Sequence, residues 1–276
     1  MPSAIQEMPL WKWILLFLAS LILAALLYGF GMVPVGLFGG IPLWVLVLLV
    51  GPGMLWLYSL VVRWFEKDRP KDLPLRQCVK HTGLGLAVGL GFFMVVVGVM
   101  MLAGAYRVVD FGNSVISILN AFSMFLIVAI GEEVMFRGVL FRWIDERWGF
   151  WWAIGISALV FGLVHITNNN ATLWASIAIA LEAGVLLGAA YKWAGTLWFP
   201  IGIHWAWNFA QGNIFGFAVS GEEAGDSILQ AAVSGPDWLT GGTFGAEASV
   251  IAAVAGTALG CWFIWKIVKK ESYGHL

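Results

Sequence analysis

Residues 127–138 read Ile-Val-Ala-Ile-Gly-Glu-Glu-Val-Met-Phe-Arg-Gly, and they place two adjacent glutamates, Glu132 and Glu133, in a segment that is otherwise almost entirely apolar. An ionisable side chain at membrane depth costs at least ~3 kcal/mol, so its default interpretation is functional. His165 and His204 occupy similarly apolar surroundings further along the chain. The sequence therefore indicates a polar site built within a membrane.

The composition is that of a membrane protein. Of the 276 residues, 61% are hydrophobic and 11% are charged, which is under half of the roughly 25% charged residues of a soluble domain. Lipid tolerates only helices or closed barrels, and the apolar runs here are too long for barrel strands. We expect an all-α fold, a polytopic membrane helical bundle, with residues 1–276 forming a single membrane domain. The net charge of −1 and the lack of a basic block argue against a nucleic-acid partner.

Hydrophobic segments of about 20 residues are long enough to cross a bilayer. They predict about eight transmembrane helices, at 11–33, 41–62, 82–104, 114–136, 150–166, 172–191, 196–217 and 247–268.

The charge pattern predicts the orientation of these spans. Residues 63–81 carry six Lys and Arg, which marks them as cytoplasmic, whereas residues 218–246 carry four acids and no Lys or Arg, as an outer loop should. With eight spans, both termini are then cytoplasmic. We expect a multi-pass integral protein of the plasma (inner) membrane of a prokaryote, in contact with the lipid bilayer.

The spacing around Gly149 allows a geometric test. Glu132 lies seventeen residues before this glycine and His165 lies sixteen residues after it. If the fourth and fifth spans form an antiparallel hairpin about Gly149, both side chains lie about 25 Å from its tip, because each helical residue rises 1.5 Å. The sequence thus predicts that this carboxylate and this imidazole face each other.

Neighbouring residues complete the predicted site. Glu133 and Arg137 have the i, i+4 spacing of a helical ion pair, which leaves Glu132 free for chemistry. Phe161 lies one turn before His165 and is expected to shield the site from water. The remaining pair, His204 and Asn208, shares one face of the seventh span and offers donors suited to a developing oxyanion.

Together these residues resemble the three motifs of the CAAX-protease and bacteriocin-processing family, also called CPBP or Abi. The motifs are Glu-Glu-x-x-x-Arg at 132–137, Phe-x-x-x-His at 161–165 and His-x-x-x-Asn at 204–208. The resemblance covers residues 115–217, and it implies an intramembrane endopeptidase with about eight helices that cleaves a membrane-associated protein or peptide.

The resemblance also implies roles for the residues. Glu132 would be the general base and His165 its partner in activating a water molecule, while His204 and Asn208 would stabilise the oxyanion. Glu133, paired with Arg137, would support them, and no cofactor is favoured.

Other interpretations of the same residues remain open. Glu132, His165 and His204 make a His₂Glu set that could hold zinc in a metal-dependent version of the protease. A non-catalytic membrane scaffold or immunity protein would keep the same fold. A proton-coupled transporter would need inverted repeats, whereas the polar residues here are confined to spans four to seven.

The sequence leaves several features undecided. Glu182, in the sixth span, could line the cavity or form a hydrogen bond with a neighbouring helix. Residues 218–246 could form a lid, a re-entrant segment or an outer loop. The substrate, whether it is prenylated, its side of entry and the oligomeric state are not readable from the chain.

Overall fold

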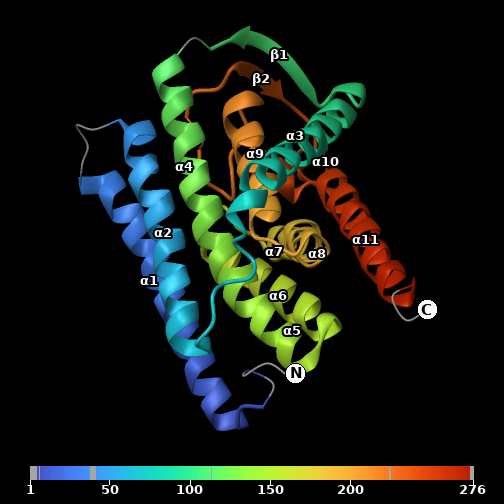
Figure 1. Cartoon of the computed structure of the whole chain (residues 1–276). Coiled ribbons are helices and arrows are strands. Elements are labelled where there is room, and N and C mark those ends of the chain that lie inside the picture. The colour runs from blue at the N-terminus through green and yellow to red at the C-terminus, as the bar shows by residue number, and fades with distance from the viewer. Residues whose placement is uncertain (1–4, 6, 38–41, 113, 224, 274–276) are drawn as a thin grey trace.

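Helices make up most of the computed structural model, which describes residues 5, 7–37, 42–112, 114–223 and 225–273 (Figure 1). The helices before the candidate site are α1 (Leu10–Leu37), α2 (Leu43–Glu66) and α3 (Cys78–Leu102), with a 3₁₀ turn η1 (Leu75–Gln77) before α3. The next group is α4 (Val115–Glu133), the π-helix η2 (Val134–Phe141), α5 (Arg142–Trp148), α6 (Phe150–Val164) and the 3₁₀ turn η3 (His165–Thr167).

The remaining helices complete the bundle. They are α7 (Leu173–Ile179), the π-helix η4 (Ala180–Gly184), α8 (Val185–Ala194), α9 (Trp198–Phe209), the π-helix η5 (Ala210–Ile214), α10 (Asp237–Thr240), the 3₁₀ turn η6 (Ala246–Ala248) and α11 (Val250–Tyr273). In Figure 1, α1 and α2 lie side by side at one flank, α11 lies at the other, and α9 stands between α4 and α3.

Six helical segments are long and apolar enough to cross a membrane, which confirms the predicted helical membrane bundle. They are Leu43–Trp64, Leu75–Leu102, Val115–Trp148, Phe150–Thr167, Leu173–Ala194 and Val250–Lys270. The count of eight stays a prediction. In the first predicted span the described apolar stretch is Leu10–Ser20, and the seventh corresponds to α9 and η5, which together are shorter than a full crossing.

The predicted turn between the fourth and fifth spans is present at Gly149. Its φ of +89° lies in the left-handed region, which glycine adopts without steric cost. The chain reverses there from α5 into α6, so that α6 packs beside η2 and α5. This hairpin brings the end of α4 and the end of α6 into the interior of the bundle.

Close contact between α3 and α9 depends on glycine. A Cβ atom added at Gly85 would collide with the carbonyl oxygen of Phe199, and one at Gly89 would collide with the carbonyl oxygen of Ile203. Small residues of this kind let helix backbones approach closely in lipid, where no hydrophobic driving force operates between helices. The contact holds α9 in the centre of the bundle.

A small antiparallel sheet, which the sequence analysis did not predict, covers one end of the bundle. It pairs β1 (Tyr106–Phe111) with β2 (Leu229–Val233), from Tyr106 opposite Val233 to Phe111 opposite Leu229. The register shifts between Val108 and Asp110. Each strand is short and depends on a partner far away in the sequence, so local patterns gave no signal for it.

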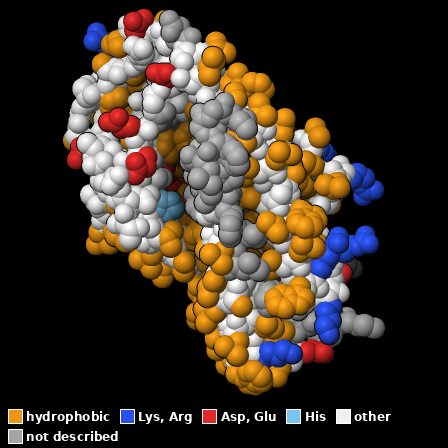
Figure 2. Space-filling model, turned by 90° about the vertical axis from the view of Figure 1, so that its left-hand side faces the viewer, with side chains coloured by type: hydrophobic (Ala, Val, Ile, Leu, Met, Phe, Trp, Pro, Cys, Tyr) orange, Lys and Arg blue, Asp and Glu red, His pale blue; other side chains and the backbone are white. Residues whose placement is uncertain are grey.

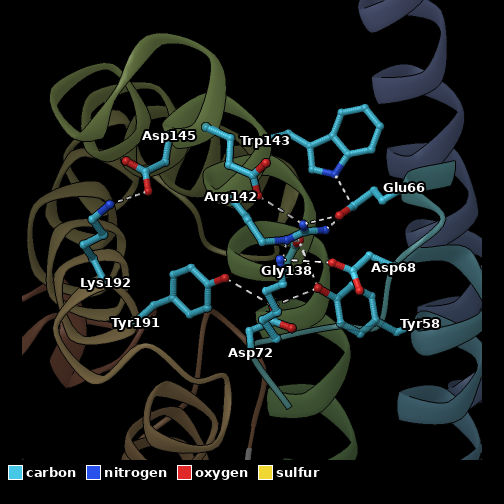
Figure 3. A network of polar contacts seen from close by, with 12 residues as sticks. Tyr58, Glu66, Asp68, Asp72, Gly138, Arg142, Trp143, Asp145, Tyr191 and Lys192 are labelled. Carbon is cyan, nitrogen blue, oxygen red and sulfur yellow. Dashed lines mark hydrogen bonds and ion pairs between the residues drawn. The ribbon is translucent and has the colours of Figure 1, made fainter. Parts of the chain in front are cut away.

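At the opposite end, a polar network joins α2 to α5 and α8 (Figure 3). Arg142 donates from both terminal nitrogens to Glu66, at 2.7 and 2.5 Å. Asp72, in the loop after α2, accepts from the hydroxyl groups of Tyr58 at 2.8 Å and Tyr191 at 3.2 Å. Burial raises the pKa of the Asp72 carboxyl, against the lowering effect of the Arg142 charge. The network fixes the loop between α2 and α3 against the bundle.

The surface separates by charge. Figure 2 shows a broad hydrophobic surface, with most Lys and Arg side chains at its lower right and most Asp and Glu side chains at its upper left. Large apolar side chains are widely exposed on the helices, such as Leu49 at 76% and Leu102 at 91%. Such exposure suits lipid contact, since a soluble monomer rarely carries apolar patches of this extent.

We predict that Gly85→Ala lowers the free energy of unfolding by about 1–3 kcal/mol, because the added methyl overpacks the contact with α9. Gly83→Ala on the same helix is the matched control, since a Cβ there meets no atom within 4 Å. Thermal unfolding of both variants in detergent measures the difference. Equal stability of the two variants would contradict the tight contact between α3 and α9.

Candidate active site

The buried carboxylate of Glu133, the last residue of α4, is the centre of a polar cluster. Its Oε1 accepts from Nη1 of Arg137 at 2.9 Å and from Nδ1 of His204 at 2.8 Å. Arg137 also donates to the carbonyl oxygen of Ala183 at 3.1 Å, and its guanidinium carbon lies 4.5 Å from the centre of the Phe161 ring. The cluster thus joins α4, η2, η4, α6 and α9.

The structure contains the expected ion pair between Glu133 and Arg137, but the hydrogen bond from His204 to the same carboxylate was not anticipated. Because a carboxylate oxygen only accepts, Nδ1 of His204 carries the proton of this bond. Glu133 therefore fixes the orientation of the His204 ring, and the other ring nitrogen, Nε2, faces Glu132.

Glu132 lies at the edge of the cavity with 16% of its side chain exposed. Its Oε2 is 3.9 Å from Nε2 of His204. This oxygen is buried and has no hydrogen-bond partner within the described part of the chain. The same is true of Oε2 of Glu133, but Glu133 is fully buried and does not line the cavity. Glu132 is therefore the carboxylate of the adjacent pair that is available to a substrate or a water molecule.

His165 begins the 3₁₀ turn at the end of α6. Its Nδ1 donates to the carbonyl oxygen of Phe161 at 2.6 Å, which leaves Nε2 as the nitrogen able to accept a proton. Phe161 itself is buried, and its ring centre is 4.9 Å from that of His165. The aromatic ring thus forms a wall beside both the imidazole and the Arg137 guanidinium.

A cavity of about 460 Å³ collects the four residues to which the sequence assigned chemistry. Its polar lining includes Glu132, His165, His204 and Asn208, and its apolar lining includes Met124, Phe125, Val128 and Met135. The predicted site residues from α4, η3 and α9 therefore do converge on one space inside the bundle.

The predicted facing of Glu132 and His165 stays a prediction, although both side chains line this cavity. The sequence did not anticipate that the His204 imidazole also approaches Glu132, with 3.9 Å between Nε2 and Oε2. Counting residues from Gly149 gives the depth of each side chain but not its rotation about the helix axis. The π-helix η2 begins at Val134, directly after the two glutamates.

Three π-helical segments border the site. η2 follows Glu133, η4 supplies the carbonyl that binds Arg137, and η5 begins two residues after Asn208. Such insertions are rare and are frequent at functional sites, because they turn a helical face relative to its regular period.

A short segment from the predicted outer loop closes the cavity. We call residues 219–222 the roof segment; Val219, Ser220 and Glu222 line the cavity. Three consecutive asparagines after η3 bind it. They donate from Asn168 to the Ser220 carbonyl oxygen at 3.0 Å, from Asn169 to the Glu222 carboxylate at 2.8 Å and from Asn170 to the Gly221 carbonyl oxygen at 3.2 Å.

Glu247 in η6 is a buried acid that the sequence analysis did not single out. It accepts a hydrogen bond from the backbone N–H of Ser220, whose φ of +50° is unusual for a residue other than glycine. Glu247 also lines a small cavity together with His165, His204 and Asn208. Burial raises its pKa to about 7, against the lowering effect of the Ser220 hydrogen bonds. Its position at the very start of the last predicted span was the one sequence signal available.

Glu182 lies apart from the cavity. It is fully buried in η4, and neither carboxylate oxygen has a hydrogen-bond partner among the described residues. A Cβ added at Gly256 would lie 2.6 Å from the Cβ of Glu182, so this acid sits at the contact with α11. Glu182 thus packs against α11, but the hydrogen bond to a neighbouring helix that the sequence offered as one alternative is not present among the described residues.

The geometry of the described residues also bears on the zinc interpretation. Glu132, His165 and His204 line the same cavity, but within residues 5–273, apart from the gaps given above, no group of three or more His, Cys, Asp or Glu is arranged to hold a metal ion. One nitrogen of each imidazole is already bonded to protein, to Phe161 in one case and Glu133 in the other.

A family comparison shows what the central part of the chain is similar to. A family model described as "Type II CAAX prenyl endopeptidase Rce1-like" matches residues 113–210. The matched segment runs from α4 to the end of α9 and contains every residue of the three motifs. The resemblance to CAAX-type membrane proteases is therefore confirmed over this segment.

A relative adds a second comparison. The chain is 32% identical over 79 residues to the "Uncharacterized protein YpbD" of Bacillus subtilis (strain 168), and the match covers 29% of this chain and 36% of that protein. The chain thus spans little more than a third of the length of that relative. No solved structure matches the chain.

We predict that Glu133→Gln lowers the free energy of unfolding by roughly 3–5 kcal/mol, because it leaves the buried Arg137 guanidinium without a counter-charge. The double variant Glu133→Gln/Arg137→Met should recover part of this loss, since it removes the unpaired charge as well. Denaturant or thermal unfolding in detergent compares the two. A double variant less stable than Glu133→Gln would contradict the charge argument.

We further predict that Glu247 makes stability depend on pH. Its pKa of about 7 lies above the ~4.3 of an exposed glutamate, so between these pH values the folded protein holds a proton that the unfolded chain has released. The stability from this group is therefore full below pH ~4 and declines by roughly 1.4 kcal/mol per pH unit up to about pH 7.

Unfolding of wild type and Glu247→Gln at pH 5 and pH 7.5 tests this pH dependence. The variant should gain stability relative to wild type at the higher pH. The control is Glu223→Gln, which changes an exposed acid in residues 218–246. This variant should show the pH dependence of wild type. The same pH slope in wild type and Glu247→Gln would rule out the effect.

Proposed function

We propose that this protein is an intramembrane endopeptidase that hydrolyses a peptide bond of a membrane-associated protein or peptide. The observation that carries the proposal is the cavity within the bundle that gathers Glu132, His165, His204 and Asn208. The match of residues 113–210 to a prenyl endopeptidase family supports the same reaction.

In the proposed mechanism, Glu132 acts as the general base. Its carboxylate takes a proton from a water molecule, which Nε2 of His165 orients by accepting a second hydrogen bond. The water oxygen then attacks the carbonyl carbon of the scissile bond. When the C–N bond breaks, the proton held by Glu132 passes to the leaving nitrogen.

His204 and Asn208 stabilise the negative charge that develops on the carbonyl oxygen. Asn208 donates from its amide, and His204 donates from Nε2 in its doubly protonated form, whose charge Glu133 balances. Support comes from the bond between Nδ1 of His204 and Glu133, because it fixes the ring before substrate arrives. Arg137 in turn holds Glu133 in place.

The surroundings suit hydrolysis within a membrane. The apolar lining from α4 and the roof segment limit the access of bulk water, which strengthens electrostatic interactions in the site. Glu132 retains an unpartnered oxygen on the cavity side of the cluster. These features favour a single, protein-held water as the nucleophile.

A zinc-dependent version is the second candidate, because Glu132, His165 and His204 all border one cavity. In it, zinc would activate the water in place of the carboxylate base. The two chemistries differ in their response to chelators.

We also propose the orientation in the membrane. The six Lys and Arg of residues 63–81 face the cytoplasm under the positive-inside rule, together with both termini. The roof segment and the small sheet then lie at the outer side. The plasma membrane of a prokaryote remains our proposed location.

The protein reconstituted in lipid vesicles should cleave a fluorogenic peptide anchored by a lipidated cysteine. Glu132→Gln and His165→Ala should each lower the rate by a factor of about 10²–10⁴, the usual contribution of acid–base groups. A peptide anchored by a prenyl group and one anchored by an acyl chain distinguish the substrate classes.

Controls separate loss of chemistry from loss of fold. Glu223→Gln, which lies outside the cavity, should cleave like wild type, and thermal unfolding should show that the Glu132 and His165 variants remain folded. Activity that survives chelators but is lost in Glu132→Gln supports the metal-free scheme, and activity restored by added zinc supports the alternative. Cleavage retained in both site variants would defeat the proposal, whereas no cleavage of any peptide by wild type favours a scaffold or immunity role.

A further inference from the structure

A second, larger hollow lies on the other side of α4 from the candidate active site. It has a volume of about 680 Å³ and runs between α2, α3, α4 and α9. Leu126 and Ile130 of α4 line it, whereas Val128 and Glu132 line the cavity of the candidate site. Residues two apart on a helix point about 200° away from each other, so the two spaces are separate.

The walls of this groove are apolar and run along a membrane span. They include Val47, Pro52, Leu55, Leu126, Ile201 and Trp205. On α2 the lining extends from Val47 to Arg63, which corresponds to about 24 Å along the helix axis. One leaflet of a bilayer contributes only about 15 Å of hydrocarbon, so the groove is long enough for an extended acyl chain.

The end of the groove at the basic side of the molecule carries two exposed arginines. Arg63 in the last turn of α2 and Arg69 in the following loop both line the groove and are exposed. Neither guanidinium takes part in an ion pair or a side-chain hydrogen bond with the described residues.

The acids nearby are occupied by other partners. Glu66 binds Arg142, and Asp68 pairs with Lys71 at 3.0 Å. The positive charge of Arg63 and Arg69 is therefore not neutralised within the described chain, and Arg63 lies at the end of the candidate membrane span Leu43–Trp64.

The geometry points to a binding site for an anionic phospholipid, with one acyl chain in the groove and the phosphate at Arg63 and Arg69. Guanidinium groups suit phosphate because their planar donors match its oxygens. Basic pockets between transmembrane helices on this side of a membrane have the same arrangement of apolar walls and cationic rim. A zwitterionic lipid would fill the walls but would not use the two charges.

Native mass spectrometry of the detergent-purified full chain tests the site, with phosphatidylglycerol and phosphatidylcholine of the same acyl chains as probes. Wild type should bind phosphatidylglycerol at least tenfold more tightly than phosphatidylcholine. Arg63→Gln/Arg69→Gln should lose most of this preference. The control Arg76→Gln/Lys80→Gln makes the same change of charge at the same end of the molecule, outside the groove lining, and should keep it.

A second variant tests the apolar walls. Ser59 lines the groove, so Ser59→Phe should weaken binding of both lipids by filling the space for the chain. If Ser59→Phe does not fold, the arginine variants still show whether the site prefers an anionic lipid. Equal binding of the two lipids, or a preference that is unchanged in Arg63→Gln/Arg69→Gln, would overturn the proposal. So would a thermal unfolding experiment in which inorganic phosphate alone protects the protein as well as phosphatidylglycerol does. The assay uses no peptide substrate, so its result does not depend on the proteolytic activity.

Discussion

The carboxylate of Glu133 is buried inside a bundle whose exterior is suited to lipid, and a charge in such surroundings is stable only when it is fully paired. One of its oxygens binds both Arg137 and His204. Because these partners come from η2 and α9, the pairing fixes the distance and the rotation of these helices. Arg137 extends the constraint to η4 and to the Phe161 ring of α6. The helices that carry the three motifs are thus held together by one buried charge cluster.

This cluster also explains why the two adjacent glutamates differ. Glu133 is fully buried and binds Arg137 and His204, while Glu132, one residue earlier and rotated about 100°, lines the cavity and is 16% exposed. The opposite face of α4 carries apolar residues toward the lipid groove. A single helix therefore separates the proposed chemistry from the proposed lipid site, and the roof segment held by Glu247 closes the side that faces away from the basic end.

Much of the fold and part of the site were readable from the sequence. Hydrophobic length predicted the helical membrane bundle, Gly149 marked the turn of a helical hairpin, and the spacing of Glu133 and Arg137 predicted their ion pair. The count of eight spans stays a prediction, because α9 is short and is not among the helices long enough to cross a membrane. The facing of Glu132 and His165 stays a prediction: both line one cavity, but depth along a hairpin does not give helix rotation, and the approach of His204 to Glu132 was not foreseen. The role of Glu247 was missed because its partner Ser220 lies in a loop without a regular pattern.

By itself the sequence determined which residues must leave water and which polar residues must find partners, because the period and length of apolar segments are local properties of the chain. Only the tertiary structure decided which residues are the partners of these polar side chains. Glu133 forms a hydrogen bond with His204 across the bundle. The asparagines after η3 form hydrogen bonds with the roof segment. In both cases the partners are far apart in the chain. Such contacts depend on the rotation and close approach of whole helices, which the π-helical segments and the glycine contact between α3 and α9 set together.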